Sequence, residues 1–132
     1  DCKYIFFLYL IMQYKHFLFS EFDSPDAPGS GEKYMNREFL EMLDYAADLC
    51  KLQFIIVSGY RTKFQNRRLS GSSSSAHLVG RAAVLQCKNA NKRYKMVAAL
   101  LESGFTRIGI CRNQRTIYCD NDDLKKDMIW LY

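Results

Sequence analysis

The helical pattern of residues 89–104 constrains the fold of this chain more than any other feature. The stretch reads NANKRYKMVAALLESG, with an Asn that can cap its start and Gly104 just after its end. Apolar residues recur in it at three- and four-residue spacing, which predicts an amphipathic helix with one buried stripe. The predicted stripe consists of Tyr94, Val97, Ala98 and Leu101.

A second helix and several short strands complete the predicted pattern. Asn36 can cap a helix over residues 37–51, where apolar residues again recur at helical spacing. A turn at Arg112–Arg115 predicts a hairpin between the two strands that flank it. This order of elements predicts an α+β fold, with a mainly antiparallel sheet and helices packed on one face. Strands are expected at residues 54–58, a buried strand, and at 81–87, 105–111, 116–120 and 128–132.

We expect the remaining segments to form the connections between these elements and an extension at the N-terminus. Residues 20–33 hold both prolines and two glycines, which predicts a loop. We expect a short polar helix or turn over residues 60–69, and a mobile loop over Ser70–Ser75. The chain of 132 residues has the length of a single domain. We expect a single domain over residues 14–132, preceded by an N-terminal extension over residues 1–13.

Composition and charge narrow the classes of partner. The apolar run Tyr4–Met12 is shorter than the about 20 residues that a helix needs to cross a bilayer, so no membrane span is predicted. The net charge is +5, but Lys and Arg are scattered along the sequence, so no nucleic-acid partner is expected. The five cysteines lack CxxC spacing and their number is odd, which favours reduced, buried thiols. We expect a monomer.

Three stretches at the ends or edges of predicted strands hold the residues best suited to chemistry. They read SGYRT at 58–62, SSAHLVGRAAV at 74–84 and IYCDND at 117–122. With FSEFDSPDAPGSG and GFTRIGI, they resemble the zinc D-alanyl-D-alanine carboxypeptidases and related peptidoglycan endopeptidases. The chain is most similar to the short single-domain versions of small phages, over about residues 14–132. The resemblance implies the α+β fold that this family shares with the hedgehog signalling domain.

The resemblance also implies where a zinc ion would be held. In the family the ligands are a His, an Asp seven residues later and a second His in a later strand, and the zinc activates a bound water. His77 matches the first ligand, but Val84 stands at the Asp position and Tyr118 at that of the second His. Two of the three zinc ligands are therefore missing, and we expect that no zinc is bound here.

Other family positions are retained. The resemblance implies catalytic roles for Arg61 and Asp120, and substrate binding by Arg61 and Ser75. Arg115 stands where some relatives have a catalytic acid, which reverses the charge.

Neighbouring cysteines do not replace the missing ligands in this prediction. If Val84 and Tyr118 point at the site, Cys87 and Cys119 lie an odd number of residues away and face the opposite side of the sheet. Asp120 has the right parity but lies about 6–7 Å further along the strand.

We therefore predict a peptidoglycan peptidase-like domain of the carboxypeptidase type that is catalytically inactive. Its expected partner is the stem peptide of peptidoglycan, since family members act on the bacterial cell wall. Two alternatives stay open: an active metallopeptidase with an atypical site of His77, Asp120 and a cysteine, and a non-enzymatic module that binds peptidoglycan or a protein. Taken singly, His77 could be a surface-loop histidine, Arg61 an ion-pair partner and Tyr118 a core aromatic.

Overall fold

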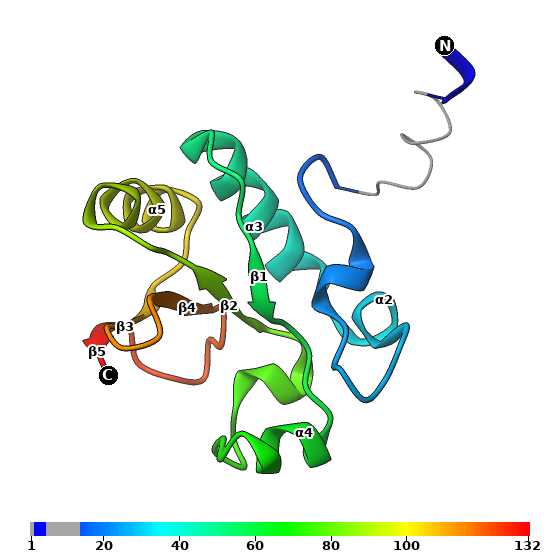
Figure 1. Cartoon of the computed structure of the whole chain (residues 1–132). Helices are drawn as coiled ribbons and strands as arrows, with labels where there is room; N and C mark the ends of the chain where they lie inside the picture. Colours follow the sequence, from blue (N-terminus) through cyan, green and yellow to red (C-terminus); the bar gives the residue numbers. More distant parts are fainter. Residues whose placement is uncertain (1, 5–13) are drawn as a thin grey trace.

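A five-stranded sheet in the order β1-β2-β4-β3-β5 forms the centre of the computed structural model, which describes residues 2–4 and 14–132 (Figure 1). Strand β5 runs parallel to β3, and the other three pairings are antiparallel. The predicted α+β class with a mainly antiparallel sheet is confirmed. The strands are β1 (Ile56–Ser58), β2 (Ala82–Gln86), β3 (Arg107–Cys111), β4 (Thr116–Asp120) and β5 (Met128–Leu131).

Two long helices, α3 (Arg37–Cys50) and α5 (Ala90–Glu102), pack on one face of the sheet (Figure 1). Their starts follow from capping, because Asn36 accepts a hydrogen bond from the Phe39 N–H and Asn89 from the Lys92 N–H, each at 2.8 Å. Both predicted helices are confirmed. No helix in the described part of the chain is long and apolar enough to span a membrane.

Four short helical elements connect these parts. The segment predicted as a loop over residues 20–33 forms most of two of them, because side chains of its own satisfy their ends. For example, the Asp23 carboxylate accepts hydrogen bonds from the N–H groups of Gly29 and Gly31 at 3.0 and 2.7 Å. The elements are η1 (Phe19–Phe22), α2 (Ser30–Tyr34), α4 (Lys63–Arg68) and η2 (Ala76–Val79).

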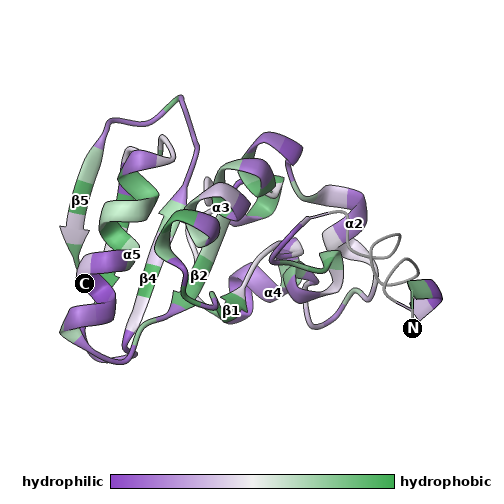
Figure 2. Cartoon of the chain, turned by 90° about the horizontal axis from the view of Figure 1, so that it is seen from above, coloured by the Kyte–Doolittle hydropathy of each residue, from purple (hydrophilic) through white to green (hydrophobic). Residues whose placement is uncertain are grey.

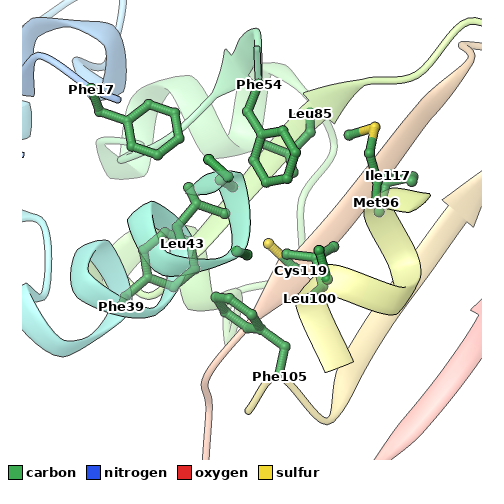
Figure 3. Close-up of a cluster of buried hydrophobic side chains, with 14 of the residues drawn as sticks. Phe17, Phe39, Leu43, Phe54, Leu85, Met96, Leu100, Phe105, Ile117 and Cys119 are labelled. Atoms are coloured by element: carbon green, nitrogen blue, oxygen red, sulfur yellow. The ribbon is translucent and has the colours of Figure 1, made fainter. Parts of the chain in front are cut away.

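The hydrophobic core lies between the two long helices and the sheet (Figure 3). Helix α3 contributes Phe39 and Leu43, and the sheet contributes Leu85 and Ile117. Helix α5 buries a stripe other than the predicted one: Met96, Ala99 and Leu100 are buried, whereas Tyr94 and Leu101 are 76% and 47% exposed. This helix carries two apolar stripes, and periodicity alone does not show which of them meets the core.

Strand β1 is an edge strand rather than the buried strand that its composition predicted. It pairs only with β2, and the side chains of Ile55 and Val57 are exposed. A β-branched run is typical of both central and edge strands, so composition does not distinguish the two positions.

Candidate functional site

A groove of about 620 Å³ lies on the sheet face opposite α3 and α5. Strand alternation creates this face, because Leu85 and Ile117 point into the core while their neighbours Val84 and Tyr118 line the groove. Val84 and Tyr118 are directly opposite each other in the β2–β4 register.

The groove brings together five of the six predicted site residues. They are Arg61, Ser75, His77, Val84 and Tyr118. The sixth, Asp120, does not line the groove, because its side chain is fully buried. The two halves of the site are joined directly, since the Arg61 N–H donates a 3.1 Å hydrogen bond to the His77 carbonyl.

Helix η2 fixes the position of His77. Ser75 caps this helix by accepting a hydrogen bond from the His77 N–H, at 3.3 Å. Gly80 ends it in a left-handed conformation with φ of 68°. A Cβ atom at Gly80 would lie 2.1 Å from the Tyr34 carbonyl oxygen, so only glycine allows this turn to pack against the end of α2.

The imidazole of His77 is buried and neutral. Its Nδ1 donates a 2.6 Å hydrogen bond to the Gly59 carbonyl, which leaves Nε2 as the unprotonated ring nitrogen. Burial, together with the positive charge of Arg61, lowers the pKa of His77 to about 4. The reading of His77 as a surface-loop histidine is wrong, since the residue is only 2% exposed.

Tyr118 belongs to a hydrogen-bonded network that continues below the groove floor. Its hydroxyl donates to the Asp120 carboxylate at 2.5 Å, and its ring lies 5.6 Å from that of His77 in an edge-to-face arrangement. Arg107 Nε donates to both Asp120 oxygens, at 2.9 and 3.1 Å, and the Asp122 N–H adds a further bond at 3.1 Å. Asp120 is therefore a structural ion-pair partner in this arrangement.

The described residues do not fit a zinc ion. Val84 offers no donor atom, and burial raises the pKa of the Tyr118 phenol well above its usual value, so its oxygen stays protonated. Cys87 and Cys119 lie in the hydrophobic core, on the opposite face of the sheet, as strand alternation predicted. Of the three family ligand positions, only His77 thus offers a donor atom, and the described part of the chain contains no group of three or more His, Cys, Asp or Glu residues that could hold a metal ion.

Arg61 places a positive charge in the groove. Its Nε donates a 3.0 Å hydrogen bond to the Ser58 hydroxyl, which fixes the orientation of the guanidinium plane. Among the described residues no carboxylate forms an ion pair with it, so the structure does not support the reading of Arg61 as an ion-pair partner. Partial burial lowers its pKa, but an arginine remains charged in proteins.

Sequence reasoning missed three residues that shape this site. Arg107 and Trp130 stack below the groove, with the guanidinium carbon 5.3 Å from the ring centroid. Gln65 lines the groove with a buried side-chain oxygen that has no donor in the described part of the chain. The signal for Arg107 was present, because a charged residue inside the apolar run FTRIGIC needs a buried partner.

Comparison with known proteins gives one result. A sequence model of the peptidase M15 family matches residues 21–120 of the chain. This range includes most of the described elements and all six predicted site residues. No curated protein matches the chain closely enough to be a relative.

Proposed function

Because the chain belongs to the peptidase M15 family, a family of zinc-dependent peptidases, we propose that it is a non-catalytic member that binds peptide without zinc. The proposed ligand is the stem peptide of peptidoglycan, of the type that ends in D-Ala-D-Ala. The proposed place of action is therefore the bacterial cell wall.

The observation that carries this proposal is the hydrogen-bonded network that includes the Tyr118 side chain. The Tyr118 hydroxyl is bound to Asp120, and Asp120 is in turn neutralised by Arg107. A ligand at Tyr118 and a catalytic carboxylate at Asp120 would both need oxygen or nitrogen atoms free to face the groove. Together with Val84, this network leaves two of the three family ligand positions without a donor atom for the zinc that hydrolysis requires.

The groove retains what peptide binding needs. Arg61 offers guanidinium N–H groups to a terminal carboxylate, and a charge-assisted bond of this kind is stronger than a neutral one. Gln65 offers a buried acceptor to a peptide N–H, and serine hydroxyls line the same groove. An open groove with a few placed polar groups favours a short peptide over a large folded partner.

Replacing Arg61 by glutamine tests this function. We expect the variant to bind a synthetic stem peptide ending in D-Ala-D-Ala about 10- to 100-fold more weakly than wild type, since a hydrogen bond to a charged group contributes about 1.5–3 kcal/mol. The measurement is isothermal titration calorimetry, with and without EDTA, and the affinity of wild type should not change with EDTA.

The matched control is Arg67→Gln, which removes the same charge from an exposed position on α4 outside the groove. This control should bind as wild type does. An equal loss in both variants, or no binding by wild type, would contradict the proposal. Hydrolysis of the peptide that EDTA stops and His77→Ala abolishes would instead establish the alternative of an active enzyme with an atypical metal site.

A further inference from the structure

Several cationic side chains gather at one end of the molecule. Residues 49–101 and 103–119 contain no Asp or Glu, although both stretches contain several Lys and Arg. The fold brings parts of them together, because the Cys87 N–H donates a 2.8 Å hydrogen bond to the Arg115 carbonyl and so holds the β2–α5 connection against the β3–β4 turn. We call this surface the cationic end; it comprises Lys88, Lys92, Arg93, Arg112 and Arg115.

The charges of the cationic end are not neutralised within the described residues. None of the five side chains takes part in an ion pair there, and four of them are exposed. The acidic residue Asp48, on the last turn of α3, is itself bound by Lys15 and His16. Figure 2 shows hydrophilic residues at the end of α5 that lies beside the C-terminus of the chain.

A cavity of about 650 Å³ lies within the cationic end, between α5 and β5. Arg93 and Arg112 both line it, together with Asn113 and the apolar side chains of Ile110 and Leu131. The Nε of Arg93 is buried and has no hydrogen-bond acceptor in the described part of the chain. An external anion cannot reach this buried atom, but it can bind the other guanidinium N–H groups of Arg93, which also have no acceptor among the described residues.

The pair of arginines favours phosphate over carboxylate. A carboxylate has two oxygens, and a single guanidinium can occupy both of them in a bidentate contact. A phosphate offers additional acceptor oxygens, so two guanidinium groups on one cavity can bind it together. The three further cations outside the cavity favour a polymer, because separate phosphates along one chain can reach them.

We propose that the cationic end binds a linear phosphate polymer, with Arg93 and Arg112 holding one phosphate group in the cavity. The cavity and the groove have only Tyr132 in common among their lining residues, and neither arginine of the cavity lines the groove. The cationic end could not be recognised from the sequence, because Lys and Arg are scattered along the chain.

The test uses the full chain and fluorescence anisotropy. The probes are inorganic polyphosphate and a single-stranded oligothymidylate, and the comparison is polyglutamate of matched charge. We expect both phosphate polymers to bind, and the double variant R93Q/R112Q to bind them about tenfold more weakly or worse, since charge-assisted hydrogen bonds are lost. The slope of log affinity against log salt should fall by about 1.4, which corresponds to two contacts on a single strand.

The control is R67Q/R68Q, which removes the same charge from the exposed end of α4. It should retain most of the affinity and the wild-type salt slope. An equal loss in both double variants, or no binding of either phosphate polymer, would overturn the proposal. Equal affinity for polyglutamate would also overturn it and would assign the surface to an acidic protein. Binding of polyphosphate alone would support it and would exclude nucleic acid as the source of the phosphates.

Discussion

We expect the replacement of Asp120 by asparagine to lower the free energy of unfolding by about 3–5 kcal/mol, because it leaves a buried guanidinium without its counter-charge. Arg107 is 8% exposed and Asp120 is fully buried, so solvent compensates little for the lost carboxylate. The same substitution weakens the bonds that Asp120 receives from the Tyr118 hydroxyl and the Asp122 N–H. The free energy of unfolding is measured by urea denaturation, with circular dichroism as the signal.

The matched control for this result is Asp123→Asn, an exposed acid three residues away, which should change stability by less than about 0.5 kcal/mol. A double-mutant cycle with Arg107→Gln should show strong non-additivity, since the two side chains contact each other. Additive effects in this cycle, or equal effects of Asp120→Asn and Asp123→Asn, would contradict the role given to the network.

The double variant Val84→Asp with Tyr118→His should acquire a zinc site that wild type lacks. The two positions are directly opposite in the β2–β4 register and line the same groove as His77. Three nitrogen and oxygen ligands of this kind suffice to hold zinc in proteins. We expect a dissociation constant of about 1 µM or tighter, measured by calorimetry with zinc chloride, against no measurable binding by wild type.

The single variants are the controls for this gain. Each adds one ligand to His77, so each should bind zinc far more weakly than the double variant. Val84→Asp alone should also destabilise the fold, because it places an unpaired carboxylate at a position that is 8% exposed. Failure of the double variant to bind zinc, while it remains folded, would show that these three groove residues do not converge on one point.

The sequence predicted the parts of this site that depend on strand alternation. Val84 and Tyr118 share a face, and Cys119 lies in the core, because the side chains of a strand alternate with a period of two. The capping residues Asn36 and Asn89 similarly predicted where both long helices begin, since capping is a local interaction.

Features that depend on contacts between distant segments were not predictable from the sequence. The pairing of Arg107 with Asp120 requires the β3–β4 register, and the burial of Met96 rather than Tyr94 requires the packing of α5 on the sheet. The cavity between Arg93 and Arg112 likewise requires α5 to lie beside the hairpin turn. Each case needs a three-dimensional neighbour that spacing along the chain does not identify.

The zinc content of the wild-type protein tests the central claim most directly. The protein should be purified without chelator, incubated with excess zinc, desalted and measured by elemental analysis. Since the described residues contain no group of three or more His, Cys, Asp or Glu that could hold a metal ion, we predict a zinc content far below one ion per chain. One tightly held zinc ion per chain that His77→Ala removes would contradict the account.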